Sequence, residues 1–461
     1  MTFRTRFSPA PTGYLHVGSA RSALFCWLAA RHDDGQVLLR VEDTNAELYR
    51  PEYLDNLRWT LDWLGLTFDG ETLFQSERAD RYSAVIEHLV ATGQAYGCDC
   101  TTEVVKERTK GSGYDGHCRD RGLVPGPGIA ARFRVPDDGA TEFDDIVRGH
   151  VRFEHTAIDD FVVQRGDGSA VFFVPNAVDD LDTEITHVVR GDDLLNTTPK
   201  VLLIRRAIPG GDEIPEPTYA HLPMIVNEAR KKLSKRRDDV AVEDYKDRGY
   251  LPEAMSNYLA VLGWGPPDGI EIRPRDEIVQ LFRLEDVVSS SAFFDKQKLD
   301  HFNAQYLREL SSAAVVEAAQ PWLKPELDGV LTDLAPHIQE RARTLQEFAE
   351  MAAFLVGDDV EIDPASWTKG VEKLPTAAAI LDSATAAYAD VDWVAETLHA
   401  TTQSIAEEHS LGLAKAQAPI RVAVTGRTVG PPLFESLVAL GRERTLKRIA
   451  AARQLLIPAV T

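Results

Sequence analysis

Residues 2–95 alternate short apolar segments with longer amphipathic segments. TFRTRF (2–7) is typical of a strand, and apolar residues then recur at helical spacing over 19–31. QVLLRVED (36–43) is a second strand-like run, and helices are predicted to begin at Pro51 and to span 79–92. Parallel strands need long crossover connections, so this order predicts a parallel sheet covered by helices.

The character of the chain changes after this alternation. Residues 95–185 carry three cysteines and alternating strand-like runs such as IAARFRV and GHVRFEH, which indicates an insertion of different architecture. The strand–helix pattern resumes in EITHVVRGDDLLNTTPKVLLIRRAI (184–208). After about residue 310, amphipathic segments rich in Ala and Leu, such as RARTLQEFAEMAAFLV, predict an all-helical C-terminal module.

Length and composition limit the classes of protein to which the chain can belong. Its 461 residues exceed one ordinary core, so about two to four domains are expected. Apolar residues make up 44%, as in a globular protein. No apolar run reaches the roughly 18 residues of a membrane span, and MTFRTRFSPAPTG lacks the apolar core of a secretory signal. Four cysteines do not form a disulfide framework in this length, so we expect a reducing, cytoplasmic location.

The charge of the chain is strongly unbalanced. Asp and Glu number 72 against 50 Lys and Arg, a net charge of -22, which argues against nucleic-acid binding by bulk attraction. KKLSKRR (231–237) is a local exception, since five of its seven residues are cations. Such a run is either a solvated loop face or a flexible loop that closes on a polyphosphate and neutralises its charge.

A second unusual stretch, SPAPTGYLHVGSA (8–20), lies between the first predicted strand and the first predicted helix. A helix N-terminus offers backbone N–H groups and the positive end of a dipole, which suit an anion. His16 can donate to a phosphate oxygen, and Gly18 lacks the Cβ that would keep a flat base away from the backbone. A His-x-Gly turn taken alone is more often structural.

Taken together and with other segments of the chain, both stretches resemble the motifs of one protein family. HVGS after the first strand, followed far downstream by KLSKR, resembles the paired nucleotide motifs of class I aminoacyl-tRNA synthetases. RFSPAPTGYLHVGSARSALF, LLRVEDTN, DDLDTEITHVVRGDDLLNTTP, GYLPEAMSNYLAVLGW and SAFFDKQKLDHFNAQYL look like bacterial glutamyl-tRNA synthetase. RVAVTGRTVGPPLFESLVALGRERTLKRI is similar to the final segment of that family, so the resemblance covers essentially the whole chain.

The resemblance implies a fold. It implies an α/β Rossmann-type class I catalytic domain, interrupted by an inserted α+β acceptor-stem-binding domain and followed by an all-α anticodon-binding domain. The implied boundaries are 1–94 and 189–240 for the two halves of the catalytic domain, 95–188 for the insertion, 241–310 for a connecting stem-contact domain, and 311–461 for the anticodon-binding domain.

It also implies an enzyme, a glutamate–tRNA ligase. The family activates glutamate with ATP, together with Mg²⁺, to glutamyl-adenylate and then transfers the glutamyl group to the 3′ end of tRNA-Glu. His16 and Gly18 match its first ATP-binding motif, and Lys232, Ser234 and Lys235 match its second. His16, Lys232 and Lys235 are the expected catalytic residues, with Lys235 stabilising the phosphate transition state.

The amino-acid pocket follows from the same resemblance. Arg6 and Arg190 match carboxylate-binding arginines of the family, and guanidinium groups pair bidentately with planar carboxylates. Glu42 matches the acid that receives the α-amino group, while Ser8 and Asn176 match further polar contacts.

Two positions depart from the pattern of the family. Ala10 stands in PAPTG where PSPTG is common, and Phe172 stands in the substrate pocket where a tyrosine is usual. A lost hydroxyl bond of this kind is worth about 0.5–1.5 kcal/mol, or up to roughly 3 if its partner is charged. The departures bear on the detailed geometry of the pocket and not on its substrate.

The clustered cysteines indicate a metal site. Cys98 and Cys100, in a C-x-C pair, and Cys118 have the reach for tetrahedral zinc. Tyr114 fits the C-x-C…Y-x3-C arrangement of relatives of the family. His117 is the commoner ligand type, but its neighbour Cys118 strains joint ligation. The zinc would be structural, and the alternative is three free thiols.

Three alternatives remain open at the level of the sequence. The enzyme either charges tRNA-Glu alone or also charges tRNA-Gln, and no residue decides between the two. A truncated relative that glutamylates a modified tRNA base shares the catalytic half and the Cys…Tyr…Cys spacing, but it generally lacks the helical module. A non-catalytic RNA-binding paralogue is disfavoured by the intact His16, Gly18 and Lys235. A monomer is expected by resemblance.

Overall fold

The structure is a computed structural model that divides into two compact units. The described residues are 2–45, 47–111, 113–233, 240–327, 331 and 333–456. Unit 1 comprises Met1–Asp244 and Met255–Asp295, and unit 2 comprises Tyr245–Ala254 and Lys296–Thr461. Among the described residues, no helix is both long enough and apolar enough to cross a membrane.

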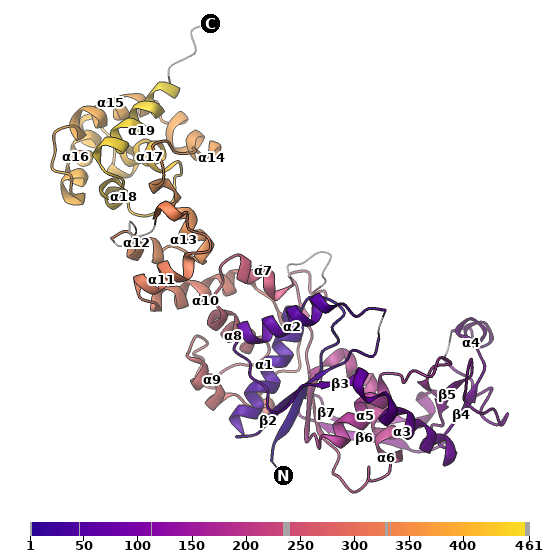
Figure 1. The fold of residues 1–461 in the computed structure, drawn as a ribbon. Helices are drawn as coiled ribbons and strands as arrows, with labels where there is room; N and C mark the ends of the chain where they lie inside the picture. The colour runs from indigo at the N-terminus through magenta and orange to yellow at the C-terminus, as the bar shows by residue number, and fades with distance from the viewer. Residues whose placement is uncertain are drawn as a thin grey trace. The chain divides into compact units, whose positions relative to one another are not determined.

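Unit 1 is built on a seven-stranded sheet in the order β3-β2-β1-β9-β10-β6-β7 (Figure 1). Its strands are β1 (Arg4–Phe7), β2 (Gln36–Val41), β3 (Leu73–Phe74), β6 (Ala140–Asp145), β7 (Gly149–Glu154), β9 (His187–Gly191) and β10 (Thr218–Leu222). All neighbours pair in parallel except β6 and β7, which pair antiparallel. The parallel sheet predicted from the alternation of elements is therefore confirmed.

Helices connect the parallel strands of this sheet or join the sheet to the insertion. They include α1 (Val17–His32), α2 (Pro51–Trp63), α3 (Ala79–Ala91), α5 (Phe173–Asp182) and α6 (Thr198–Ala207). Pro51 stands in the first turn of α2, where its missing N–H costs nothing. Gly35 precedes β2 because a Cβ there would collide with the carbonyl oxygen of Phe3 on the neighbouring chain segment.

The insertion has a small sheet of its own. β4 (Ala95–Cys98), β5 (Ala130–Phe133) and β8 (Val162–Gln164) form an antiparallel sheet in the order β4-β5-β8, and α4 (Thr102–Thr109) lies beside it (Figure 1).

Two strands from the same part of the chain belong to the main sheet instead. β6 pairs in parallel with β10, and β7 pairs with β6 at the edge. The sequence grouped GHVRFEH (149–155) with the insertion, but most of that run forms β7. β6 lies next to β10 in the sheet, and β7 forms the edge. Most residues of β7 are exposed, as is common in edge strands.

The rest of the described chain is mainly helical. In unit 1 it adds α9 (Arg275–Leu281) and the parallel pair β11 (Ile225–Val226) and β12 (Ala292–Phe293), while α7 (Val242–Asp247) and α8 (Pro252–Ala260) span the division between the units. Unit 2 contains α10 (Lys296–Glu309), α11 (Ser312–Ala319), α12 (Ala335–Gln339), α13 (Leu345–Ala352), α14 (Pro364–Trp367), α15 (Ala377–Tyr388), α16 (Ala395–Glu408), α17 (Leu413–Thr425), α18 (Leu433–Leu440) and α19 (Arg442–Leu455). Its core is apolar and includes Phe348, Tyr388 and Ile449. The predicted helical C-terminal module is confirmed, because the described part of unit 2 from Lys296 onward is mainly helical.

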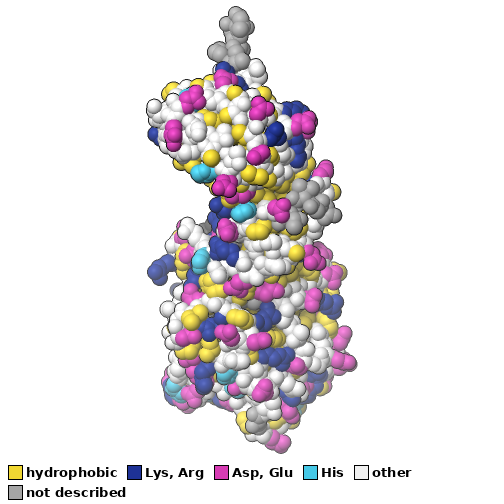
Figure 2. Space-filling model, turned by 90° about the vertical axis from the view of Figure 1, so that its left-hand side faces the viewer, with side chains coloured by type: hydrophobic (Ala, Val, Ile, Leu, Met, Phe, Trp, Pro, Cys, Tyr) yellow, Lys and Arg dark blue, Asp and Glu magenta, His cyan; other side chains and the backbone are white. Residues whose placement is uncertain are grey.

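The surface shows no separation of the two signs of charge on the face seen in Figure 2. Acidic and basic side chains are interspersed there. On this face the acidic side chains therefore form no single patch.

Candidate functional site

A cavity of about 480 Å³ opens in unit 1 at the carboxyl ends of the parallel strands. β1 leads into the loop Ser8–Pro9–Ala10, β9 ends at Gly191, and β10 ends at Leu222, all of which line the cavity. β1 lies between β2, which follows it in sequence, and β9, which comes much later, so the direction of winding reverses here. Ligands of open α/β sheets bind at such a switch point.

His16 and Gly18 lie at the start of α1 on the wall of this cavity. His16 is the N-cap residue, and its Nδ1 accepts hydrogen bonds from the backbone N–H groups of Gly18 (3.0 Å) and Ser19 (3.2 Å). A Cβ on Gly18 would lie 2.9 Å from Cε1 of the His16 ring. The glycine therefore also makes room for the histidine cap, which the sequence alone did not indicate.

The downstream lysine motif is described only in part. Lys232 lines the cavity, and its Nζ lies 3.0 Å from Oδ2 of Asp193, with both side chains largely exposed. Ser234 and Lys235 fall within 234–239, outside the described residues. Arg21, which the sequence analysis did not single out, also lines the cavity, and its Nη1 donates to the carbonyl oxygen of Leu262 (3.1 Å).

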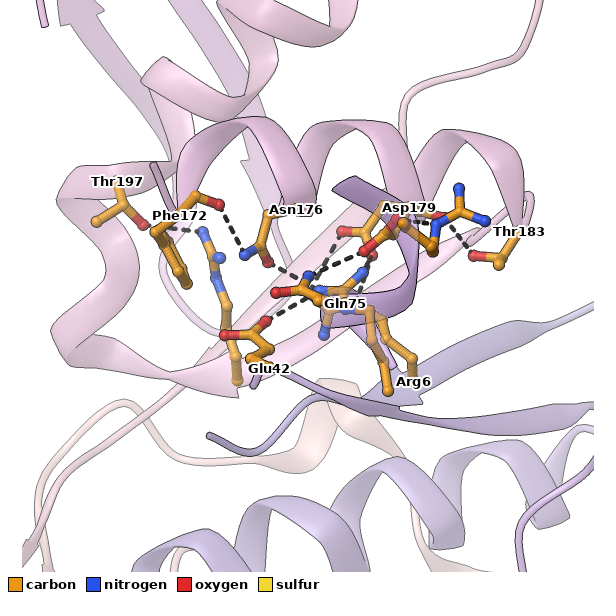
Figure 3. A network of polar contacts seen from close by, with 12 residues as sticks. Arg6, Glu42, Gln75, Phe172, Asn176, Asp179, Thr183 and Thr197 are labelled. Carbon is orange, nitrogen blue, oxygen red and sulfur yellow. Dashed lines mark hydrogen bonds and ion pairs between the residues drawn. The ribbon is translucent and has the colours of Figure 1, made fainter. Parts of the chain in front are cut away.

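Arg6 belongs to a buried ion cluster (Figure 3). Its Nε and Nη2 donate to Oδ1 and Oδ2 of Asp180, at 2.9 and 3.3 Å. Arg40 shares the same carboxylate through a 2.5 Å contact between Nη1 and Oδ1. Burial alone would raise the pKa of Asp180, but Arg40 and Arg6 hold it well below its ordinary value. The positive charge of Arg6 is therefore already paired with the Asp180 carboxylate at the edge of the cavity.

Asn176 and Glu42 complete this cluster. Arg40 Nη2 donates to Oδ1 of Asn176 at 2.8 Å and pairs with Oε1 of Glu42 at 3.3 Å. Asn176 Nδ2 donates to the carbonyl oxygen of Phe172 at 3.0 Å, one turn earlier in α5 (Figure 3). Burial raises the pKa of Glu42 above its ordinary value, although Arg40 and Arg6 act against this shift.

Sequence reasoning missed Arg40 and Asp180. Both occur in quoted motifs, Arg40 in LLRVEDTN and Asp180 in the DD pair before LDTEI. The separation of four residues between Asn176 and Asp180 was the available signal, because in a helix it places both side chains on one face. Phe172 lines the cavity as expected, and it supports Asn176 through its carbonyl oxygen.

Arg190 is held differently from Arg6. Its Nε donates to Nε2 of His221 (3.2 Å), and its Nη2 donates to Oγ1 of Thr198 (2.8 Å). Among the described residues it makes no ion pair and Nη1 has no hydrogen-bond partner, although the residue is only 7% exposed. Burial lowers the pKa of Arg190 to about 10. A buried guanidinium with neutral partners is suited to receive an anion.

Ser8 is a second group prepared for a ligand. Its Oγ is buried on the cavity side of β1 and has no hydrogen-bond partner among the described residues. A buried hydroxyl left unpaired costs free energy, so a polar ligand that reaches it is favoured. Ala10, the first departure from the family pattern, lies in the same loop and lines the cavity with a methyl group.

The three predicted cysteine ligands come together in the insertion. The sulfur atoms of Cys98, Cys100 and Cys118 all lie within 4.8 Å of one another. Tyr114 Oη lies 3.5 Å from Cys98 Sγ and accepts a hydrogen bond from the backbone N–H of Cys118 at 2.8 Å. Among the described residues, His117 does not join this group of potential ligands.

Each of these sulfur atoms also accepts a hydrogen bond from an arginine. The donors are Arg132 for Cys98 (3.2 Å), Arg121 for Cys118 (3.2 Å) and Arg108 for Cys100 (3.7 Å). Burial acts to raise the pKa of Cys98, but hydrogen bonds from Tyr114 and Arg132 hold it below its ordinary value, whereas burial raises the pKa of Cys100 to about 11. Spacing and proximity thus fit a metal ion bound by the three cysteines.

Comparison with known proteins agrees with this geometry. Residues 2–301 match the model of the class I tRNA synthetases (E and Q), catalytic domain, and residues 314–453 match an anticodon binding domain. The chain is 52% identical to a protein named glutamate–tRNA ligase from Frankia casuarinae, with 98% of each chain covered. It is 50% identical, again with 98% of each covered, to a protein of the same name from Thermobifida fusca.

A solved structure supports the same assignment. The glutamate tRNA ligase of Elizabethkingia meningosepticum, crystallised in complex with its amino acid, superposes with a TM-score of 0.81 at 28% identity, covering 99% of this chain and 100% of that one. The chain therefore belongs to the class I tRNA synthetases of the E and Q family, among the glutamate–tRNA ligases.

Proposed function

We propose that this protein joins L-glutamate to the 3′ end of tRNA-Glu in an ATP-dependent reaction that proceeds through glutamyl-adenylate. The observation that carries the proposal is Arg190, a buried guanidinium with only neutral partners among the described residues, at the cavity that His16 and Gly18 also line. Membership of the glutamate–tRNA ligases supplies the reaction class.

ATP would bind at the start of α1 and beneath the lysine motif. His16, Gly18, Lys232, Ser234 and Lys235 are the residues that we assign to it. Moving Lys232 from Asp193 to a phosphate would cost little free energy, because both side chains are exposed and an exposed ion pair is weak. Mg²⁺ would accompany the triphosphate.

Glutamate would bind between Arg190 and the cluster around Asp180. We assign one carboxylate to Arg190, the α-ammonium group to Glu42, and further contacts to Arg6, Ser8, Asn176 and the wall formed by Phe172. Arg190 makes no ion pair among the described residues, so its positive charge is available to a substrate carboxylate. Glutamate offers a side-chain carboxylate as well as its α-carboxylate, whereas the side-chain amide of glutamine is neutral and presents N–H donors to donors.

The chemistry requires positioning and charge stabilisation. In the first step a carboxylate oxygen of glutamate attacks the α-phosphorus of ATP and pyrophosphate leaves. In the second step a terminal ribose hydroxyl of tRNA attacks the activated carbonyl and AMP leaves. No protein nucleophile is needed in either step, so the lysines and His16 act on phosphate charge, while the arginines hold the substrate.

A structural zinc ion would bind Cys98, Cys100, Cys118 and Tyr114. The proximity of the sulfur atoms supports the three cysteines, and the Tyr114 oxygen near Cys98 favours Tyr114 over His117 as the fourth ligand. The ion would join β4, which ends at Cys98, to the loop that carries Cys118. Its contribution would be to the shape of the insertion, since no activated water is called for.

We assign the remaining parts by the same reasoning. The insertion at 95–188 would contact the acceptor stem, 241–310 would connect, and 311–461 would contact the anticodon, with the catalytic domain in two halves at 1–94 and 189–240. Support comes from the anticodon binding domain matched over residues 314–453. A cytoplasmic monomer remains our expectation.

One experiment tests the proposed function directly. The purified protein is incubated with ATP, radiolabelled glutamate and either tRNA-Glu or tRNA-Gln, and acid-precipitable aminoacyl-tRNA is counted. Charging of tRNA-Glu supports the proposal, whereas no charging of either tRNA refutes it. Charging of both tRNAs retains the chemistry and widens the tRNA range.

A further inference from the structure

Four residues accept hydrogen bonds from Arg190: His221, Thr198, Leu194 through its carbonyl oxygen (3.3 Å) and Thr197 (3.4 Å), of which His221 and Thr198 make the shortest contacts. β9 and β10 pair in parallel with Arg190 opposite His221, so the two side chains are cross-strand neighbours. Thr198, the first residue of α6, supplies a hydroxyl group 2.8 Å from Nη2. Nε and Nη2 are thus both engaged by the protein, and Nη1 has no hydrogen-bond partner among the described residues.

The contacts of His221 determine its tautomer. Its Nε2 faces two donors, Arg190 Nε at 3.2 Å and Thr198 Oγ1 at 3.2 Å. Arginine nitrogen can only donate, so Nε2 must carry the lone pair. The ring proton therefore lies on Nδ1, which is 2.6 Å from Oδ2 of Asp145.

Asp145 is placed for this contact by the unexpected position of β6. It is the last residue of β6, which pairs with β10 in the main sheet. Its Oδ1 accepts from the backbone N–H groups of Val147 (2.9 Å) and Arg148 (2.8 Å), which anchors the carboxylate. Asp145 and His221 are both buried, so water does not compete for their hydrogen bond.

We propose that Asp145, His221 and Thr198 are positioning residues for glutamate binding, which hold the Arg190 guanidinium so that its remaining edge faces the substrate carboxylate. This inference rests on the proposed function of the cavity. Asp145 acts through His221 by fixing the proton on Nδ1, and His221 and Thr198 act directly on Arg190.

We call the chain of contacts from Asp145 through His221 to Arg190 the relay. The variant Asp145→Asn tests it. An asparagine retains Oδ1 for Val147 and Arg148, but its NH2 group replaces Oδ2, which contacts both Nδ1 and the backbone N–H (3.0 Å) of His221, so an N–H is presented to Nδ1. The imidazole then carries its proton on Nε2, and a donor faces the donor Nε of Arg190. We expect the Michaelis constant for glutamate, measured by ATP–pyrophosphate exchange with tRNA present, to rise about ten- to a hundredfold while that for ATP stays within about twofold.

Thr198 provides a test with a rescue. Thr198→Val removes the closest acceptor of Nη2 and leaves the carbonyl oxygen of Leu194 (3.3 Å) and Oγ1 of Thr197 (3.4 Å), so it should raise the Michaelis constant for glutamate by up to about tenfold. Thr198→Ser keeps the hydroxyl group and should restore a value near that of the unmodified protein.

Thr141→Val is the matched control. Thr141 is buried on β6, as Asp145 is, and its Oγ1 lies 3.1 Å from Nε2 of a different histidine, His155. Loss of this hydrogen bond lowers stability without touching Arg190, so neither Michaelis constant should change. Labelling with ¹⁵N-histidine should further show the Nδ1–H tautomer of His221 in the unmodified protein and the Nε2–H tautomer in Asp145→Asn.

The outcomes separate the relay from the proposed function. An unmodified protein that fails to charge tRNA-Glu refutes the function itself. If the unmodified protein charges tRNA-Glu, the relay is refuted by an unchanged Michaelis constant for glutamate in Asp145→Asn. Equal rises for glutamate and ATP, or a rise in Thr141→Val of the same size, also refute it, because they show a general disturbance of the sheet.

Discussion

Replacing Arg190 by alanine should separate substrate recognition from stability. Among the described residues, Arg190 makes no ion pair, and its Nε and Nη2 donate to the neutral His221 and Thr198. Burial lowers its pKa to about 10, so the protein bears a desolvation cost to keep this cation. Arg190→Ala should therefore change the free energy of unfolding little, because His221 Nε2 keeps the hydroxyl of Thr198.

The expected loss in glutamate use is large. One or two charge-assisted hydrogen bonds to a substrate carboxylate are worth about 1.5–3 kcal/mol each. Taking about 3–4 kcal/mol in total, kcat/KM for glutamate should fall roughly 150- to 900-fold. The Michaelis constant for ATP should hardly change, since Arg190 lies on the amino-acid side.

Arg6→Ala is the comparison variant, because it should lower the stability of the protein, whereas Arg190→Ala should mainly lower glutamate use. Arg6 donates two of the hydrogen bonds that neutralise Asp180, so its loss leaves that buried carboxylate with Arg40 alone. Breaking a buried pair costs about 3–5 kcal/mol, which should appear as a lower midpoint in urea unfolding. The reasoning is wrong if Arg190→Ala destabilises as much as Arg6→Ala, or if it leaves the Michaelis constant and turnover for glutamate unchanged.

Four further predictions concern the other features of the site. Glutamate should form adenylate far more readily than glutamine, because the amide would leave positive charge uncompensated; pyrophosphate exchange with equal rates for both amino acids would contradict this. Lys235→Ala should lower turnover of adenylate formation by roughly a hundred- to a thousandfold and affect the Michaelis constant for ATP much less, while Arg237→Ala, the control, should change turnover little. Metal analysis should find about one zinc per chain, and Cys98→Ser should lower the zinc content and harm tRNA-dependent steps more than folding of the nucleotide domain; a metal-free protein with normal charging would refute the site. Burial lowers the pKa of His221 below its ordinary value of about 6.5, so the Michaelis constant for glutamate should stay level down to about pH 6.5 and rise only below it, as Nε2 gains a proton; a rise that begins nearer pH 8 would contradict the neutral imidazole.

Elements of the fold were predictable where local periodicity and topology agree. The helix predicted over 19–31 is α1 (Val17–His32), and the helix predicted to begin at Pro51 is α2. The placement of β6 and β7 was not predictable, because a strand pattern shows that a strand forms but not which sheet edge it joins. That placement brings Asp145 to His221, so the relay behind Arg190 was hidden for the same reason.

In the candidate site, too, some features were predictable from the sequence and others were not. Motif resemblance named Arg6 and Arg190 as a pair with one role, and nothing in the sequence distinguished them. The structure does, because Arg6 shares Asp180 with Arg40 and Arg190 makes no ion pair among the described residues. Such a difference depends on partners that lie far away in the sequence, and resemblance between motifs does not report it.

The interposed histidine explains how Arg190 can be both anchored and reactive toward a carboxylate. A direct pair between Asp145 and Arg190 would stabilise the folded protein, but it would neutralise the guanidinium before a substrate arrived. His221 donates its Nδ1–H to the Asp145 carboxylate, and its neutral Nε2 accepts from Arg190. Arg190 is thereby oriented without being neutralised by direct contact. The arrangement lowers stability in favour of binding, as functional sites commonly do. The carboxylate of the substrate then supplies the negative charge that Arg190 lacks in the unliganded protein.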